Sequence, residues 1–330
     1  MFGFSLYLDQ DKEYILKKIY DFKDCDILFT SLHYPSDDSI MAKFYRLLEE
    51  THKLNMEICV DVNNRIVDKF PNLLDNDIVF RLDYGFSYDM IARLSKYNRV
   101  AINASTVTYE DLEYLKNLGC DFSKISAWYN YYPLPYTGMS GNDVIRKNKI
   151  ISQFGLKIFA FFQGDKDLRG PLYKTLPSLE EDRKEDPFYS YLKLKRFYGI
   201  DNLLVSEGLT HNSKKFIENY ENKKIINLEV ILDKDFKKLK EIKVRKDINE
   251  YLIRNERDYK FIGKIDNSYI KKGDILILNK NSNRYSGEIE IARKNLGFDT
   301  TRNIIGKVKN LNILNLIEGG DRIVFNRISK

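Results

Sequence analysis

The stretch IVFRLDYGF, Ile78 to Phe86, ends a short apolar run with Arg81, Asp83 and a glycine. A strand that is buried on both faces normally lacks charge, so these residues indicate a strand end at a functional surface. Similar β-branched or aromatic runs recur through the first 210 residues, with helical periodicity between them. The eight predicted strands are 2–8, 26–31, 57–62, 77–82, 99–104, 124–129, 157–162 and 202–207.

Eight strands alternating with helices predict an α/β fold, the (β/α)8 TIM barrel. The rival is an open doubly wound sheet, but no glycine-rich phosphate loop follows the first strand. Thr108 and Asp111 have capping-box spacing and Gly119 follows, which predicts a helix over 108–119. Ser178 with Glu181 predicts a second helix start.

The pattern changes after about residue 232, where a charge-rich segment begins. We expect the barrel to occupy 1–232 and a small all-β domain to occupy 240–330. Short runs separated by Gly and Asn are typical of a small β barrel or sandwich. These runs are 259–265, 274–280, 286–293, 303–309 and 321–327.

Composition narrows the class of protein. The 330 residues are 43% hydrophobic, enough for a large core, and no apolar run is long enough to span a membrane. Three widely spaced cysteines argue against a disulfide framework or a zinc site and fit a cytoplasmic location. The net charge of +6 lies mainly after residue 230, but no base-stacking motif accompanies it, so no nucleic-acid partner is predicted.

Polar residues gather at the predicted strand ends, where TIM barrels place their active sites. They are Asp61, Arg81, Asp83, Asn103, Asn130 and Glu207. Any one of them could be a structural ion pair or loop cap, but all six together favour a site. Several carboxylates without a His or Cys cluster indicate acid/base chemistry that needs no metal or other cofactor.

Two loops combine features expected of a ligand site. Residues 129–142 carry Tyr136 and Thr137 among tyrosines and glycines, a composition that suits a sugar. Residues 164–183 carry Arg169 and Gly170, which offer a guanidinium and backbone N–H groups. Barrels often hold phosphate near the loops after strands seven and eight, so this second loop is the expected phosphate site.

Longer motifs make the chain resemble the bacterial 6-phospho-N-acetylmuramidase family. The matching words are FTSL (29–32), VDVNNR (60–65), RLDYGF (81–86), NAS (103–105), NYYPLPYTGMS (130–140), RGPLYKTLPSLEEDR (169–183) and NRYSGEIEI (283–291). The resemblance implies a TIM barrel followed by a cyclophilin-like β domain. It implies cytoplasmic hydrolysis of the β-1,4 bond of N-acetylmuramic acid 6-phosphate–N-acetylglucosamine, a step of peptidoglycan recycling.

Glycoside hydrolysis needs a proton donor and a second group at the anomeric carbon. We hypothesise Asp61 and Asp83 as the catalytic pair, with Glu207 as an alternative acid. Substrate-assisted attack by the 2-acetamido group stays open. Substrate binding is expected from Arg81, Asn103, Asn130, Tyr136, Thr137, Arg169 and Gly170.

Two departures from the family pattern bear on the site. Tyr129 stands where members often have His, and Ser206-Glu207 stands where Gly-Asp is more common. Other readings are a sugar-phosphate sensor or a different barrel enzyme on a phosphorylated sugar. Homodimerisation through the C-terminal part is a further open alternative.

Overall fold

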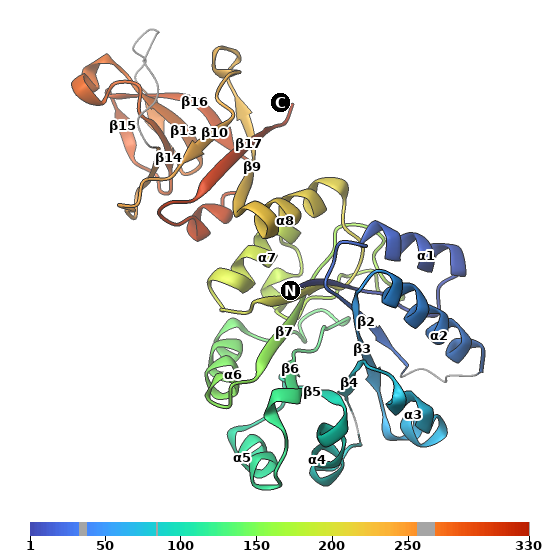
Figure 1. The fold of residues 1–330 in the computed structure, drawn as a ribbon. Coiled ribbons are helices and arrows are strands. Elements are labelled where there is room, and N and C mark those ends of the chain that lie inside the picture. The colour runs from blue at the N-terminus through green and yellow to red at the C-terminus, as the bar shows by residue number, and fades with distance from the viewer. Residues whose placement is uncertain (33–37, 84, 256–267, 330) are drawn as a thin grey trace. The chain divides into compact units, whose positions relative to one another are not determined.

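The computed structural model describes residues 1–32, 38–83, 85–255 and 268–329 (Figure 1). The chain divides into two compact units, Met1–Thr210 and His211–Lys330. Among the described residues, no helix has both the length and the apolar character required to cross a bilayer.

The first unit is built on a closed barrel of eight parallel strands, each paired with its neighbours in chain order. This confirms the predicted TIM barrel. The strands are β1 (Phe2–Ser5), β2 (Ile27–Ser31), β3 (Glu57–Val62), β4 (Val79–Leu82), β5 (Arg99–Asn103), β6 (Ile125–Trp128), β7 (Lys157–Phe162) and β8 (Asn202–Val205). Pairing of β1 with β8 closes the barrel.

Helices follow the strands and surround the barrel (Figure 1). They are α1 (Lys12–Asp21), α2 (Asp38–Lys53), α3 (Asn64–Lys69), α4 (Tyr88–Tyr97), α5 (Tyr109–Asn117), α6 (Gly141–Gln153) and α7 (Pro187–Arg196). The capping box predicted for α5 is present at Thr108 and Asp111. The helix start predicted at Ser178 corresponds only to a short 3-10 helix, Glu180–Asp182, with Leu179 at its N-cap. The Ser178 hydroxyl instead accepts the Phe161 N–H, and the next α-helix, α7, begins at Pro187.

An apolar core fills the barrel below the carboxyl ends of its strands. Trp128 and Phe159 stack with ring centroids 4.2 Å apart, and Phe29 and Phe161 meet edge to face. Cys59, Ala101 and other small or branched side chains complete this cluster. The charged residues of β3 and β4 therefore project above a packed floor rather than into an open channel.

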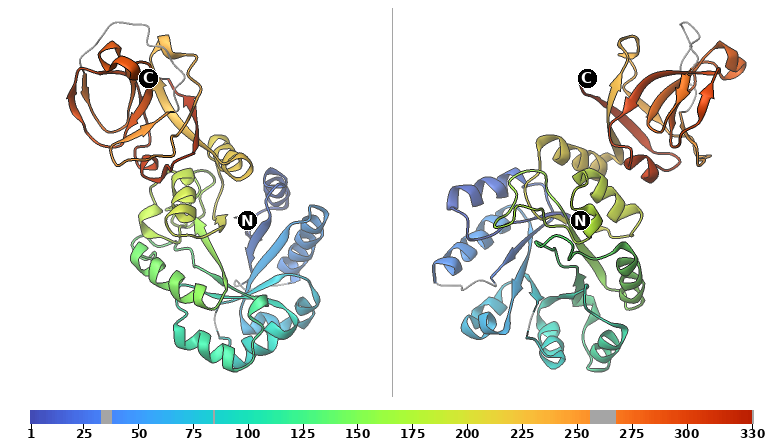
Figure 2. Two further views of the ribbon diagram at one scale, coloured as in Figure 1. Left: turned by 60° about the vertical axis from the view of Figure 1, so that its left-hand side comes forward. Right: turned by 180° about the vertical axis from the view of Figure 1, so that it is seen from behind.

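The second unit is mostly β. Helix α8 (His211–Lys223) precedes a seven-stranded sheet in the order β10-β17-β9-β16-β13-β14-β11, which curves strongly in Figure 2. The strands are β9 (Ile225–Leu232), β10 (Glu241–Lys243), β11 (Leu252–Arg254), β13 (Asp274–Leu278), β14 (Ile289–Ala292), β16 (Arg302–Val308) and β17 (Arg322–Arg327). A separate pair joins β12 (Ser268–Ile270) to β15 (Gly297–Asp299).

The unit boundary lies before the position expected from sequence. The expectation grouped Ile225–Leu232 with the barrel, but β9 pairs with β16 and β17 in the second sheet. Its parallel pairing with β17 joins residues about a hundred positions apart, which local periodicity does not reveal. The strand expected at 259–265 lies outside the described residues.

Candidate active site

Neighbouring strands bring Asp61 and Arg81 together at the barrel mouth. In the parallel pair of β3 and β4, Asp61 is directly opposite Arg81, and Asp83 follows just beyond the end of β4. These residues line a cavity of about 190 Å³. Its other walls come from Phe29, Asn130, Tyr131 and Phe161.

Arg81 is the centre of this cavity's polar cluster. Its Nη1 donates to Asp61 Oδ1 at 2.7 Å and to Asp83 Oδ1 at 3.4 Å, while Nη2 donates to Asn130 Oδ1. Burial alone would lower the pKa of Arg81, but the adjacent Asp61 and Asp83 carboxylates outweigh burial and raise it. The guanidinium is therefore a fixed positive charge between two carboxylates.

The two carboxylates differ in exposure. The Asp61 side chain is 10% exposed, whereas that of Asp83 is 29% exposed. Asp61 is thus the more enclosed partner and has the shorter bond to Arg81. Asp83 is the more exposed partner and has the longer bond to Arg81, so a molecule bound in the cavity can reach it.

Asn103 supports this cavity without lining it. Its Oδ1 accepts the Ser105 N–H at 2.9 Å, and Ser105 Oγ accepts the Asn130 N–H at 3.0 Å. These two hydrogen bonds link Asn103 to Asn130 through Ser105 and hold Asn130 beside Arg81. Asn103 therefore acts as a support for the loop after β6.

Glu207 lies in a different cavity from the aspartates. This second cavity, of about 490 Å³, is lined by the segment after β1, by α1 and by the loops after β7 and β8. The Glu207 carboxylate accepts backbone N–H groups from Arg169 at 3.1 Å and from Gly164 and Leu176 at 3.3 Å each. Burial raises the pKa of Glu207, and these N–H donors partly offset the rise. Glu207 thus fastens the loop after β7 at three points.

Arg169 and Gly170 line the second cavity beside Glu207. The Arg169 guanidinium stacks on the Tyr7 ring at 3.5 Å and donates to both carboxylate oxygens of Asp9, at 3.2 and 3.3 Å. Tyr7 in turn packs edge-on against Tyr131, with centroids 6.3 Å apart. Tyr7 lines the second cavity and Tyr131 lines the aspartate cavity, so the two cavities adjoin at this pair of rings.

Tyr136 and Thr137 lie elsewhere. Tyr136 lines a third cavity of about 790 Å³ between the loops after β6 and β7, and its side chain is 90% exposed. The Thr137 hydroxyl donates to the Leu134 carbonyl at 2.6 Å. Neither residue lines the aspartate cavity or the Arg169 cavity.

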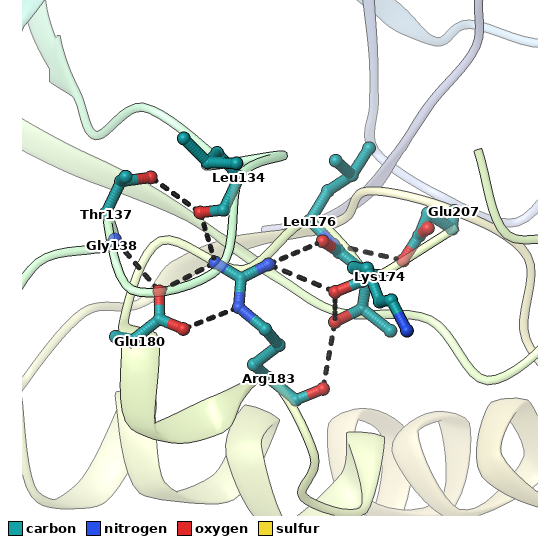
Figure 3. A network of polar contacts seen from close by, with 9 residues as sticks. Leu134, Thr137, Gly138, Lys174, Leu176, Glu180, Arg183 and Glu207 are labelled. Atoms are coloured by element: carbon teal, nitrogen blue, oxygen red, sulfur yellow. Dashed lines mark hydrogen bonds and ion pairs between the residues drawn. The ribbon is translucent and has the colours of Figure 1, made fainter. Parts of the chain in front are cut away.

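Arg183 holds the two loops together, as Figure 3 shows. Its guanidinium donates to both Glu180 carboxylate oxygens, at 2.6 and 2.7 Å, and to the carbonyls of Lys174, Thr175 and Leu134. Glu180 also accepts the Gly138 N–H. Hydrogen bonding to Arg183 lowers the pKa of Glu180 to about 2. The sequence placed Arg183 in a matched motif but gave no sign of this fastening role.

Tyr129 points away from the mouth. Its side chain is fully buried, and the hydroxyl donates to Asn148 Oδ1 of α6 at 2.8 Å. Burial raises the pKa of the Tyr129 hydroxyl well above its ordinary value. The residue therefore joins β6 to α6 and does not reach the aspartate cavity.

Sequence reasoning missed two residues that shape the cavities: Tyr7 and Lys18. Tyr131 belongs to the loop 129–142 that the sequence marked as a ligand loop, but it was not among the expected binding residues. Lys18 had a readable signal, because it falls on the apolar face of α1 with Ile15 and Ile19. In the described part of the chain, no cluster of three or more His, Cys, Asp or Glu side chains is arranged to hold a metal ion.

The fold and cavities define a TIM-barrel protein with a carboxylate pair and an adjoining cation-containing cavity at its mouth. The model for "6-phospho-N-acetylmuramidase, N-terminal" matches residues 2–222, and that for "6-phospho-N-acetylmuramidase, C-terminal" matches residues 225–326. The chain belongs to the 6-phospho-N-acetylmuramidase family, a family of enzymes.

Solved structures agree with this assignment of fold. A conserved Enterococcus faecalis protein of unknown function is 27% identical with a TM-score of 0.89, over 99% of this chain and 96% of that one. An uncharacterized B. cereus protein is 22% identical with a TM-score of 0.81, over 98% of this chain and 99% of that one. A comparison with curated protein sequences finds no significant match.

Proposed function

We propose that this enzyme hydrolyses the β-1,4 bond between N-acetylmuramic acid 6-phosphate and N-acetylglucosamine, in the cytoplasm, as a step of peptidoglycan recycling. Family membership supports a phosphosugar substrate. The observation that carries the proposal is the single cavity in which Arg81 holds Asp61, Asp83 and Asn130 at the strand ends. Most glycoside hydrolases use two carboxyl groups at one site.

The asymmetry of the pair gives each carboxyl a role. Arg81 bonds Asp61 more closely than Asp83 and so stabilises negative charge on Asp61. Asp61 is the anionic partner, which either captures the anomeric carbon or orients the 2-acetamido group for substrate-assisted attack. Asp83 is the proton donor to the leaving oxygen, because a substrate covering its exposed side would remove water and favour its protonated form.

Glu207 has a different role in this proposal. Its carboxylate already accepts three backbone N–H groups, one on Oε1 and two on Oε2, which favours a role in holding the loop over one as the catalytic acid. It shapes the loop that carries Arg169 and Gly170. Arg169 and the Gly170 backbone contribute to the 6-phosphate site, with phosphate competing against Asp9 for the guanidinium.

Remaining binding residues fall into two groups. Asn130 contacts substrate beside Arg81, and Asn103 supports it through Ser105. Tyr136 offers an exposed ring and Thr137 a hydroxyl on the loop after β6, from which they contact an outer part of the substrate.

The test compares the phosphorylated disaccharide with its unphosphorylated twin, followed by mass spectrometry of both sugars. We expect cleavage of the phosphorylated compound alone. Asp61→Asn and Asp83→Asn should each lower kcat by about 100-fold or more. Asp24→Asn is the matched control, since Asp24 is exposed and precedes β2 at the other end of the barrel.

Near-normal turnover in both aspartate variants would remove the catalytic assignment. If folded wild-type protein cleaves neither disaccharide but is thermally stabilised by the phosphorylated one, it is a sugar-phosphate sensor. If it converts another phosphorylated sugar, it is a different barrel enzyme.

A further inference from the structure

Lys18 is a buried cation in the second cavity. It stands in α1, is 8% exposed and lines the 490 Å³ space beside Arg169 and Glu207. Within the described ranges its ammonium makes no hydrogen bond or ion pair. Its recorded contact is with the Tyr14 ring, at 5.9 Å from Nζ to the centroid, the outer limit for a cation–π interaction.

An unpaired ammonium in such a place is destabilising, because burial removes its hydration. Burial lowers the pKa of Lys18 to about 8, with Asp167 and Glu207 opposing that change. Lys18 therefore stays mostly protonated at neutral pH. Because this buried ammonium has no ion-pair partner among the described residues, the cavity can bind an anionic ligand beside it.

The other charged groups of the cavity have their own partners or face water. Glu207 has both oxygens on backbone N–H groups, and Arg169 is paired with Asp9. Asp167 is exposed at the rim, with a φ of 49°. Among the described charged groups of the cavity, Lys18 is the buried one whose ammonium N–H groups can still donate to a ligand.

Acidic side chains in the cavity restrict which anions can bind there. Asp9, Asp167 and Glu207 all line the cavity, so an incoming anion meets negative charge as well as Lys18 and Arg169. A phosphoryl group can satisfy both cations at once and can replace Asp9 on the Arg169 guanidinium. Asp9 is 57% exposed and can turn into solvent when it is replaced.

We infer that Lys18 is a specificity-determining residue that binds the phosphoryl group of the substrate in this cavity, opposite the Arg169 guanidinium. The inference rests on the proposed function for the identity of the sugar. It assigns the phosphate to the cavity beyond Tyr7 and Tyr131, while the glycosidic bond lies over Asp61 and Asp83.

The test is thermal unfolding of the full chain with three probes: N-acetylmuramic acid 6-phosphate, N-acetylglucosamine 6-phosphate and N-acetylmuramic acid. Lys18→Met removes the charge and keeps much of the volume. Lys17→Met is the matched control, because Lys17 is the exposed neighbour on the same helix. Without ligand, Lys18→Met should unfold at the wild-type temperature or above it, since an unpaired buried charge is gone.

With ligand, we expect both phosphorylated sugars to stabilise the wild type and Lys17→Met. Their apparent affinity for Lys18→Met should fall roughly 10- to 100-fold, the range for a lost charged hydrogen bond. A lower unfolding temperature of ligand-free Lys18→Met would show a structural role and overturn the inference. Unchanged affinity for both phosphates would overturn it too, as would a selective loss of N-acetylmuramic acid binding, which would assign Lys18 to the lactyl carboxylate.

Hydrolysis assays separate this inference from the proposed function. Selective cleavage of the phosphorylated disaccharide with an unchanged KM in Lys18→Met would refute the Lys18 site and leave the reaction standing. Lys18-dependent binding of sugar phosphates by a wild type that cleaves nothing would support the site and refute the reaction.

Discussion

Replacing Arg81 with methionine is the most informative perturbation of the aspartate cavity. The guanidinium is buried and bonds Asp61, Asp83 and Asn130. Methionine keeps an apolar stem of similar length but leaves two carboxylates together without their positive partner. We expect the buried Asp61 carboxylate to lose more stabilisation than Asp83, because its bond to Arg81 is the shorter one.

The expected cost follows from the geometry. Removing one partner of a buried, hydrogen-bonded pair destabilises a protein by about 3–5 kcal/mol. For a unit of roughly 200 residues, each kcal/mol moves the unfolding midpoint by about 2–4 °C. The midpoint of Arg81→Met should therefore fall by roughly 6–20 °C at pH 7.5. Arg93→Met, an exposed position on α4, should change it little.

Circular dichroism melts at pH 7.5 and pH 5 test the cause of the loss. In the variant, the buried carboxylates without Arg81 take up protons more readily when folded than when unfolded. The variant therefore gains stability relative to wild type as the pH falls, and the gap narrows. The double variant Arg81→Met/Asp61→Asn should recover part of the loss at pH 7.5, because it removes the uncompensated charge.

Two results would refute this reasoning. One is a midpoint within about 2 °C of wild type, which would mean that the carboxylates do not depend on Arg81. The other is a large loss that is equal at both pH values and is not relieved by Asp61→Asn. That pattern would point to lost packing around the arginine stem instead of lost charge compensation.

Three further predictions concern the loops. Glu180→Gln should lower the free energy of unfolding by about 2 kcal/mol at pH 7, because it weakens the bonds to Arg183. The folded pKa of Glu180 is about 2, below its ordinary value, so this stabilisation should disappear as the pH falls from about 4.5 to 2. Thermal melts of the two proteins in acid should therefore converge. Glu207→Gln should speed hydrogen exchange at the Arg169 amide, because the one carboxamide oxygen can keep the bonds to Gly164 and Leu176 while its NH2 group then faces the Arg169 N–H; unchanged exchange would contradict the fastening role. Arg169→Ala should raise KM for the phosphorylated disaccharide by roughly 10- to 100-fold, and an equal effect on the unphosphorylated twin would exclude phosphate contact.

Much of the barrel could be predicted because its signals are local. Apolar strands and amphipathic helices alternate in the sequence, and polar residues at strand ends mark the mouth. Asp61 and Arg81 could be placed near one another because β3 and β4 are consecutive parallel strands. The same reasoning anticipated the aspartate cavity.

Other features depend on contacts between distant segments, which spacing does not encode. Glu207 was grouped with the aspartates because it follows a strand, yet three N–H groups of a preceding loop occupy it. Ser178 had the spacing of a helix cap, but the Phe161 N–H uses its hydroxyl. Lys18 is different, because its place on the apolar face of α1 with Ile15 and Ile19 is readable from the spacing and agrees with its burial.

The way Glu207 holds its loop has a consequence for how such enzymes can diversify. Its three partners are main-chain N–H groups of Gly164, Arg169 and Leu176. A Cβ at Gly164 would lie 2.2 Å from the Gly208 carbonyl oxygen, but every amino acid except proline can supply the donor at the other two positions. Side chains at those positions can therefore be exchanged while the path of the chain is retained. A carboxylate at the end of β8 thus separates the shape of the loop from its chemistry, and lets substrate preference drift without the barrel having to adapt.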